Sequence, residues 1–471
     1  MEKGEAVKKP LLENYNGQGS EISSSAPLTI VVGFSCIVVY CSSFAGGNSI
    51  GYSSPAESGI LNDLGLDLAD YSVFVSIFLI GSLCGAVWSG KVAEFIGRRG
   101  TMGVTDLFCI TGWLAIAFSK DALWLDFGRF LVGCGVGLSC YAAPIYVAEI
   151  TPKTVRGALM SVKPLLMSSG KALFFFIGPV VNWRILALTA LVPYLLQLPG
   201  LLFISESPRW LMKIGQAEKS ESALRRLRGE KANISQETAE IRDYIEYSKR
   251  VSGDGILSVF QRKYSYCLIV GTGLVAFRQL GGLGGISFYA SSIIKSAGFS
   301  SEIGSIAVGT TEILSAILGV CFIDKFGRRP LLLISAAGTC FGSFILGLSF
   351  FLQGLHFGEK ITPVLGLAGI LVYFGFFSLG MEGIPWIISK EIFPVNIKGA
   401  AGSIASVVSL ISGWVISYTF NFIFEWNSAG TFFIYAAMSG ASVLFVWKMV
   451  PETKGRSLEE IQASLLISPQ Q

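Results

Sequence analysis

Twelve apolar stretches, each long enough to cross a lipid bilayer, dominate this chain of 471 residues. A helix of about 20 apolar residues spans the roughly 30 Å of hydrocarbon in a bilayer, and it satisfies its own backbone hydrogen bonds there. The stretches cover residues 28–50, 71–93, 101–119, 123–148, 157–180, 185–204, 265–294, 303–323, 330–352, 363–389, 400–424 and 430–450. The sequence therefore predicts an all-α membrane protein with twelve transmembrane helices in a lipid bilayer.

Composition excludes several other classes of protein. Hydrophobic residues make up 52% of the chain and charged residues 14%, whereas about 25% of a soluble domain is charged. The net charge of +4 leaves no large basic surface for nucleic acid. The nine cysteines lie mostly in apolar stretches without metal-ligand spacing, and His356 is the single histidine. We therefore expect no enzyme chemistry, no catalytic residues, no metal site and no cofactor.

A charged segment, 205–264, separates the stretches into two groups of six. It holds twelve Lys or Arg and nine Asp or Glu residues, and its helical runs are Ala217–Arg228 and Ser235–Ser248. This pattern predicts a helical linker rather than a further domain. The expected organisation is a disordered tail at 1–27, a six-helix bundle at 28–204, the linker at 205–264, a second six-helix bundle at 265–450 and a tail at 451–471.

Basic residues lie in alternate loops, and they set the expected orientation. Lys or Arg follows the second, fourth, sixth, eighth and tenth stretches, whereas the loop after the first stretch is acidic and has neither. Because positively charged loops stay in the cytosol, we expect both termini and the linker to be cytosolic. Leu11-Leu12 in the N-terminal tail resembles a dileucine signal for sorting adaptors, although such pairs also occur by chance.

Two short motifs occur once in each group of six. The first motif is Gly90 to Glu94 and Gly97-Arg98-Arg99, matched by Gly319 to Asp324 and Gly327-Arg328-Arg329. The second motif has an acid, a proline, a base and a glycine at identical spacing, as Glu149, Pro152, Arg156 and Gly157 and as Glu391, Pro394, Lys398 and Gly399. Matching loops in corresponding places indicate a duplicated six-helix unit.

The repeated charges favour a gate. A carboxylate at a membrane-embedded helix end can pair with arginines of the neighbouring tight loop. Such pairs would hold the cytosolic ends together in one state and separate in another. Gly97 and Gly327 permit the sharp turn and the close approach. The alternative is that the basic residues of these loops only anchor the helices in their orientation. This alternative explains a single copy of the motif better than two copies that each have acidic partners.

These motifs resemble those of the sugar porters of the major facilitator superfamily, from about residue 28 to residue 460. The resemblance rests on Gly90 to Arg99, on Arg129 with Gly133, Gly135 and Gly137, on Pro144 to Gly157, on Glu206 to Trp210 and on Pro451 to Gly455. Asn182 to Arg184, Glu391 to Pro394 and Gly455 to Glu460 are similar to the plant early-response-to-dehydration (ERD-type) monosaccharide transporters.

The resemblance implies a fold and a function. The fold would be the major facilitator fold, in which two pseudo-symmetric six-helix bundles rock around a midplane site. The cargo would be a monosaccharide, such as a hexose, carried across the vacuolar or plasma membrane. The implied cytosolic gating network comprises Glu94, Arg98, Arg99, Glu149, Arg156, Glu206, Arg209, Asp324, Arg328, Arg329, Glu391, Lys398 and Glu452.

The sequence departs from the family pattern where the sugar would bind. A neutral sugar is held by a few polar side chains and by aromatic rings. The resemblance places the substrate site at the family-like residues Gln279, Tyr289 and Trp386 and at the altered positions Lys163, Arg278, Gly284, Glu312, Glu382 and Ser409. Because intramembrane charges usually pair, we expect Lys163 and Arg278 to pair with Glu312 and Glu382. Lys171 is a further embedded charge whose face the sequence leaves open.

Two features bear on the transport mechanism. The first span, Ile30–Ile50, contains no acid, whereas proton-coupled members carry one there, so facilitated diffusion is favoured over proton coupling through Glu312 or Glu382. Gly281, Gly282, Gly284 and Pro385 would supply local bending, or the glycines would allow close helix packing. The alternatives to a sugar transporter are a carrier of a charged small solute and a non-transporting sensor with a diverged site.

Overall fold

The computed structural model describes residues 29–152, 154–230, 232–251, 259–358, 360–394 and 397–454. This part of the chain is helical and contains no strand, and twelve of its helical segments are long and apolar enough to cross a membrane. The predicted all-α membrane fold with twelve transmembrane helices is therefore confirmed. The sorting-signal candidate Leu11-Leu12 lies outside the described residues.

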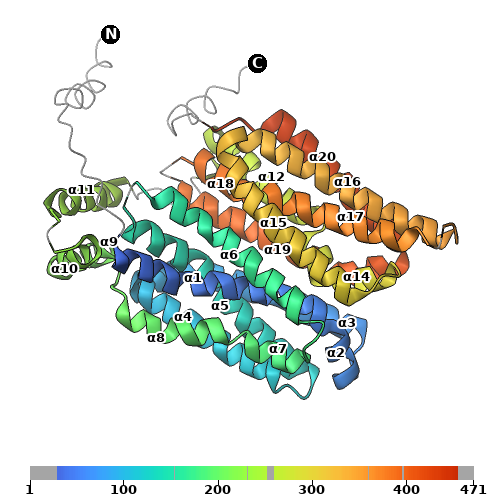
Figure 1. The fold of residues 1–471 in the computed structure, drawn as a ribbon. Helices are drawn as coiled ribbons and strands as arrows, with labels where there is room; N and C mark the ends of the chain where they lie inside the picture. The colour runs from blue at the N-terminus through green and yellow to red at the C-terminus, as the bar shows by residue number, and fades with distance from the viewer. Residues whose placement is uncertain are drawn as a thin grey trace, which may run out of the picture.

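Eight helices form the first half of the molecule (Figure 1). They are α1 (Ile30–Gly51), α2 (Ser53–Leu64), α3 (Leu68–Phe95), α4 (Gly97–Ala117), α5 (Ala122–Ile150), α6 (Arg156–Ile177), α7 (Trp183–Thr189) and α8 (Val192–Phe203). Only Tyr52 separates α1 from α2. The acidic segment after the first span is therefore a helix that continues beyond the membrane, where the sequence analysis placed a loop.

The second half contains the remaining six spans, two of them divided into shorter helices. Its elements are the 3-10 turn η2 (Arg262–Tyr264), α12 (Ser265–Leu280), α13 (Leu283–Phe288), α14 (Ala290–Ser296), α15 (Ser301–Phe326), α16 (Arg328–Gly354), α17 (Thr362–Phe376), the π-helical turn η3 (Phe377–Met381), α18 (Ile384–Ile392), α19 (Lys398–Trp426) and α20 (Ser428–Met449).

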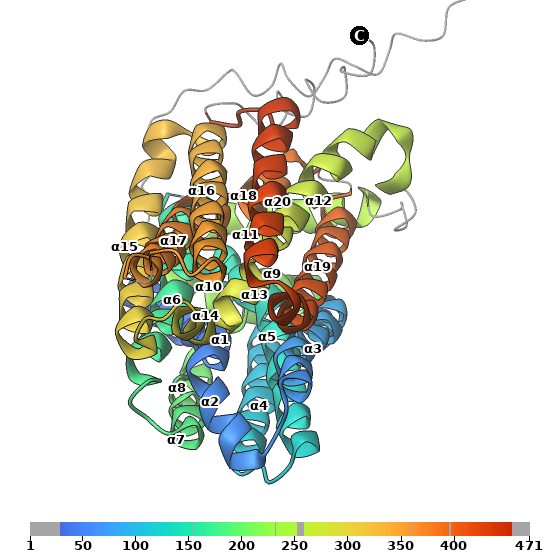
Figure 2. The same cartoon turned by 90° about the vertical axis from the view of Figure 1, so that its right-hand side faces the viewer.

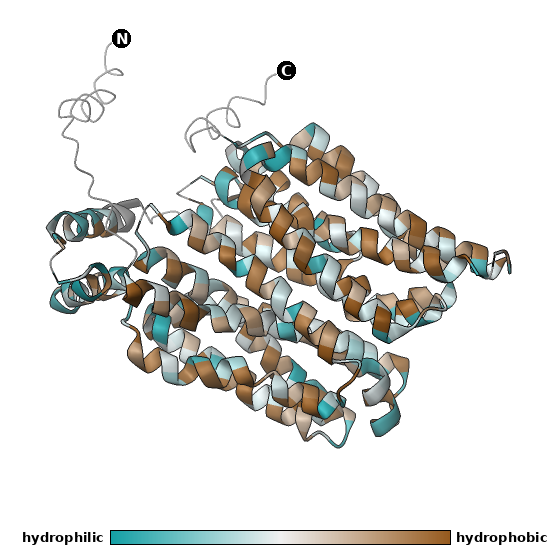
Figure 3. Cartoon of the chain, viewed as in Figure 1, coloured by the Kyte–Doolittle hydropathy of each residue, from teal (hydrophilic) through white to brown (hydrophobic). Residues whose placement is uncertain are grey.

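Three short helices belong to the segment between the halves. They are α9 (Pro208–Lys213), α10 (Ala217–Arg228) and α11 (Ser235–Val251), and the last two match the helical runs predicted from the sequence. Hydrophilic residues gather on α10 and α11 (Figure 3). These helices lie at one end of the bundle, called here the linker end, and α2, α7 and α14 lie at the opposite end, called the far end (Figure 1).

The two halves meet along two seams. One seam runs between α3 and α19 and the other between α6 and α15. Figure 2 shows the helices of the first half, in blue to green, below most of the helices of the second half. Both seams join one helix from each half, so motion of one half against the other changes the contacts along them.

The seventh span is interrupted at a glycine pair. Gly282 has φ 94°, and a Cβ atom there would lie 2.5 Å from Cδ2 of Tyr435. Gly284, by contrast, is helical, and its Cβ would lie 3.3 Å from the Gly413 carbonyl oxygen on α19. Of the predicted bending residues, Gly281 and Gly282 divide the helix, whereas Gly284 permits close packing.

Replacing Gly282 by alanine tests this division. An L-residue in the left-handed region costs about 1–2 kcal/mol, and the new methyl group would collide with the Tyr435 ring. We expect a lower melting temperature in detergent. Gly402→Ala is the matched control, because a Cβ on Gly402 meets nothing within 4 Å. Equal melting of the two variants would show that the break does not depend on glycine.

Candidate functional site

An ion pair joins the two halves inside the membrane. Lys171 on α6 contacts Glu312 on α15, and their side chains are 5% and 0% exposed. The ammonium group also lies 5.3 Å from the centre of the Phe374 ring. The expected pairing of Glu312 with Lys163 or Arg278 is therefore corrected. Lys171 takes this role because its position on α6 faces α15.

A second polar contact joins the halves one helical turn away. Ser168 on α6 donates a hydrogen bond of 3.2 Å to Oε2 of Glu382, which lies between η3 and α18. Within the described part of the chain, Glu382 forms no ion pair with Lys163 or Arg278. Through Lys171, the α6 helix thus contacts α15. Through Ser168, it contacts the tenth span, which is interrupted between α17 and α18.

Arg278 and Gln279 occupy the last turn of α12. The Gln279 amide donates to the Ser409 hydroxyl on α19 at 3.2 Å, and both side chains are buried. The Arg278 guanidinium lies 5.7 Å from the centre of the Phe377 ring, and its Nε is buried without an acceptor among the described residues. This turn therefore offers an amide, a hydroxyl and an unpaired cation.

The remaining candidate substrate residues lie in different surroundings. Tyr289 is fully buried, stacks on Phe420 at 5.0 Å between ring centres and donates to the Ser417 carbonyl at 3.5 Å. Lys163 on α6 and Trp386 on α18 are half-buried. Tyr289 thus belongs to the packed interior in this conformation, whereas Lys163 and Trp386 are only partly covered.

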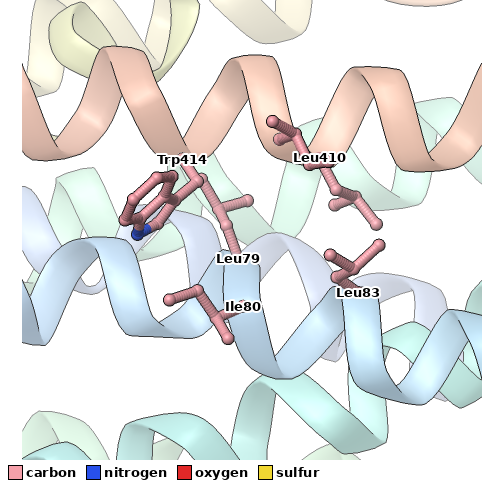
Figure 4. A pocket seen from close by; sticks show the side chains of 6 residues that line it. Leu79, Ile80, Leu83, Leu410 and Trp414 are labelled. Atoms are coloured by element: carbon pink, nitrogen blue, oxygen red, sulfur yellow. The ribbon is translucent and has the colours of Figure 1, made fainter.

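An apolar groove follows the seam between α3 and α19 (Figure 4). It has a volume of about 210 Å³ and is lined by Leu79, Ile80, Leu83, Leu410, Ile411 and Trp414. The lining offers no hydrogen-bonding oxygen to a sugar, so the groove suits lipid or packing rather than cargo.

Polar contacts close the two halves against each other at the far end. The hydroxyls of Ser54 on α2 and Ser291 on α14 are 2.8 Å apart. Ser292 on α14 donates to the buried Glu57 carboxylate on α2 at 2.5 Å. Along the seam between α3 and α19, Asn421 donates to Ser72 at 3.0 Å. The halves are thus joined near the far end through α2 and α14 and along the α3–α19 seam.

At the linker end, the first copy of the repeated motif forms a dense network. Arg98 binds Glu149 through two parallel bonds of 3.0 Å. The backbone N–H groups of Arg98 and Arg99, at the start of α4, donate to Glu206 at 3.1 to 3.2 Å. Gly97 has φ 83°, and a side chain there would collide with this carboxylate. Glu206 thus accepts from the helix N-terminus, where negative charge is favoured.

The second copy repeats this arrangement more loosely. Glu452 accepts from the backbone N–H groups of Arg328 and Arg329 at 3.2 and 3.1 Å, and Gly327 has φ 92°. The Arg328 guanidinium, however, lies 3.8 Å from Glu391. The same turn and cap are therefore built twice, but the ion pair is tight only in the first half.

Other members of the predicted network have different partners. Glu94 pairs with Lys213 at 2.7 Å, and Arg209 lies over the Tyr244 ring at 5.5 Å. Arg156 donates to the Thr151 carbonyl at 3.4 Å. Lys398 is exposed, and the side chain of Asp324 lies outside the described residues. Every ion pair described at this end joins elements of one half or the linker, so none bridges the two halves.

Two buried charges in the first half have no role among the sequence-based expectations: Arg129 is named there only as a motif residue, and Asp106 is not named. The Arg129 guanidinium is fully buried, donates to the Ser53 hydroxyl at 2.6 Å and lies 4.6 Å from the centre of the Phe78 ring, a cation–π arrangement. Asp106 on α4 is fully buried, and neither carboxylate oxygen has a hydrogen-bond partner in the described chain. The sequence signal for Asp106 was that it is an isolated acid within a predicted span, because ionisable residues at membrane depth commonly mark functional sites.

Comparison with known proteins gives a consistent result. Residues 25–465 match the family model described as sugar (and other) transporter. Two Arabidopsis thaliana proteins, Sugar transporter ERD6-like 10 and Sugar transporter ERD6-like 11, are 48% and 45% identical to this chain over 93% and 98% of its length and 96% and 98% of theirs. An inward open structure of the xylose transporter XylE from E. coli is 25% identical, covers 92% of this chain and 99% of its own, and superposes with a TM-score of 0.77.

Exchanging the two charges of the buried ion pair tests its role. Glu312→Lys or Lys171→Glu alone leaves two like charges in contact, and breaking a buried pair costs about 3–5 kcal/mol. We expect each single variant to give little monodisperse protein and the Lys171→Glu/Glu312→Lys double variant to recover most of it. Size-exclusion chromatography in detergent measures this yield. Equal yields of single and double variants would contradict the pairing.

The far-end closure is expected to depend on pH. Burial raises the pKa of Glu57 from 4.5 to about 7, and the Ser292 hydrogen bond and the Lys295 charge lower it by less. A carboxyl group exposed to water by opening would return to its ordinary pKa. Protonation therefore stabilises the closed form fully below pH 4.5, and this contribution is lost as the pH rises through about 7.

Electron paramagnetic resonance can measure this dependence. Spin labels at the exposed Asn62 and Ser300 report the separation of the two halves at the far end. We expect longer distances to become more populated as the pH rises from 4.5 to 7. Glu57→Gln, which mimics the protonated group, should keep the short distance across this range. A pH response that persists in Glu57→Gln would assign the effect to another group.

Proposed function

This chain belongs to the sugar transporter family of the major facilitator superfamily, and we propose that it carries monosaccharides across its membrane by alternating access. The observation that supports this proposal is that the far end of the molecule is closed by contacts between the halves and the linker end is not. Serine, asparagine and glutamate contacts join the halves at the far end, whereas the described ion pairs at the linker end stay within one half or the linker. In our proposal a central site is therefore open toward the linker end in this conformation.

The repeated networks supply the device for the opposite state. Arg98 and Arg328 stand at matching turns and bind Glu149 and Glu391 of their own halves. Glu206 and Glu452 cap the helices that begin at these turns. In our proposal each network keeps its half rigid, and the two halves approach each other at the linker end when the far end opens. Static anchoring alone would not require the paired acids.

Facilitated diffusion is the proposed mode of transport. The first span has no acid, and among the described residues no carboxylate pairs with the buried Arg129. The Arg129 guanidinium donates one hydrogen bond, to Ser53, and lies beside aromatic rings, whereas its Nε and Nη1 have no partner there. A carboxylate that could exchange a proton beside this cation is thus missing from the described contacts. One observation favours proton coupling as the second candidate, namely the unpartnered carboxylate of Asp106 in the interior of the first half.

We further propose an orientation with the linker end in the cytosol. The basic residues of α10 and the arginines of both repeated turns gather at this end, and positive charge is retained in the cytosol. The vacuolar membrane and the plasma membrane both fit this orientation. Sorting adaptors that read Leu11-Leu12 would select between them, and replacement of both leucines by alanine tests that choice in plant cells.

Uptake into liposomes tests the transport proposal. Purified protein is reconstituted, and uptake of labelled glucose, fructose and xylose is measured with and without an imposed proton gradient. We expect saturable uptake of at least one sugar, equal in both conditions, because a facilitator moves cargo only down its own gradient. Absence of uptake of every monosaccharide tested by monodisperse protein would favour a non-transporting sensor.

Asp106→Asn separates the two modes of coupling. A facilitator should retain uptake in this variant, apart from a small change caused by the new amide. If uptake of the unmodified protein follows the proton gradient and Asp106→Asn removes that dependence, the proton-coupled candidate is correct. Glu425→Gln is the control, because Glu425 is exposed near the far end of α19 and lines a hollow whose other residues all belong to the second half.

A further inference from the structure

The centre of the molecule carries more positive than negative charge after its ion pair is formed. Lys171 and Glu312 neutralise each other. Glu382 is then left with two bases, Arg278 on α12 and Lys163 on α6. Lys390 lies nearer the linker end of α18, beside Glu391, which pairs with Arg328. Charges at membrane depth are costly and normally face a partner or an aqueous path. An excess of cations therefore calls for a physical explanation.

Arg278 has free donors beside groups that bind hydroxyls. Arg278 directly precedes Gln279 in the chain, and the Gln279 amide contacts Ser409. No hydrogen bond or ion pair of the Arg278 side chain is present within the described residues, and its Nε is buried without an acceptor. The charge of Glu382 acts on Arg278, but the Glu382 carboxylate is bonded to Ser168. The planar guanidinium is suited to a carboxylate, which it can bind through two parallel bonds.

Two lysines extend the positive charge toward the linker end. Lys163 on α6 and Lys390 on α18 belong to opposite halves, and their charges act on each other, together with that of Lys398. Lys390 is exposed and Lys163 is half-buried. Among the described residues neither lysine has an ion pair. Charges of one sign along a path raise the local concentration of the opposite ion.

We infer that the cargo of the proposed sugar transport is an anionic monosaccharide, a sugar acid whose carboxylate binds Arg278 while its hydroxyls bind Gln279, Ser409 and Glu382. Lys163 and Lys390 attract the same anion at the linker end. A neutral hexose would gain nothing from the three unpaired cations, and a cationic solute would be repelled by them. This inference rests on the proposed transport function and narrows its substrate class.

Transport by the unmodified full-length protein in liposomes gives the first test. Uptake of labelled D-glucuronate is compared with that of labelled D-glucose, and each is used in large excess as a competitor of the other. We expect glucuronate to be taken up with an efficiency about tenfold or more above that of glucose, because a carboxylate makes a charge-assisted, two-bond contact with the arginine, whereas a sugar hydroxyl accepts only a neutral hydrogen bond. Movement of a net negative charge should also make glucuronate uptake respond to an imposed membrane potential, and glucose uptake should not respond.

The outcomes separate this inference from the transport proposal. Saturable glucose uptake that excess glucuronate does not inhibit would overturn the anionic cargo and leave sugar transport intact. Failure of both sugars to enter, with monodisperse protein, would remove the transport proposal and the inference together. Uptake of both sugars with equal efficiency and no response of glucuronate to potential would also overturn the inference.

Two variants locate the anion site. Arg278→Gln should reduce glucuronate uptake about tenfold or more while glucose uptake is maintained or increased, and Lys163→Gln should reduce glucuronate uptake by a smaller factor. Lys448→Gln is the matched control, because Lys448 is an exposed lysine near the linker end of α20. If Arg278→Gln does not yield monodisperse protein, Lys163→Gln decides the test. Undiminished glucuronate uptake in the available variants would contradict the inference.

Discussion

Burying a charge within a membrane costs free energy, and this cost determines how the charged side chains in the interior of this protein are arranged. Lys171 and Glu312 meet this cost by direct contact across the two halves, so the contact also holds α6 against α15. Arg129 meets it with a serine and a cage of aromatic rings inside one half. Arg278 lies near one aromatic ring, Phe377, but its side chain has no hydrogen bond or ion pair among the described residues, which is the reason for assigning it to a bound anion. The three embedded cations therefore have different roles. Lys171 joins the two halves, Arg129 packs within one half, and Arg278 is assigned to bind the cargo.

The duplicated turns show how one chemical device is used twice with different strength. In each half a glycine in the left-handed region lets a carboxylate from a later segment reach the N-terminus of a helix. The first copy adds a bidentate arginine–glutamate pair, whereas the second copy has a longer contact. The looser second half also contains two divided spans, α12 to α14 and α17 to α18, whereas the first half contains one, α7 to α8. We expect local rearrangements during transport to occur mainly in that half.

Much of the architecture was predictable because it depends on local sequence. The number of spans follows from apolar length, the linker helices α10 and α11 follow from their amphipathic runs, and the break in the seventh span follows from adjacent glycines. The α2 helix was missed because its acidic residues resemble those of a loop. Asp106 was missed because it belongs to none of the repeated motifs, although a lone acid within an apolar span is itself a signal.

The sequence by itself determined the membrane class, the twelve spans, the duplication and the identity of the charges that enter the interior. Local periodicity and spacing suffice for these properties. Only the tertiary structure decided which charges are paired, because residues far apart in the chain compete for the same partner. It brought Lys171 rather than Lys163 to Glu312, gave Glu382 to Ser168 and left Arg278 unpaired. The physical reason is that packing between the halves fixes how each helix is rotated about its own axis. This rotation decides which side chains face each other.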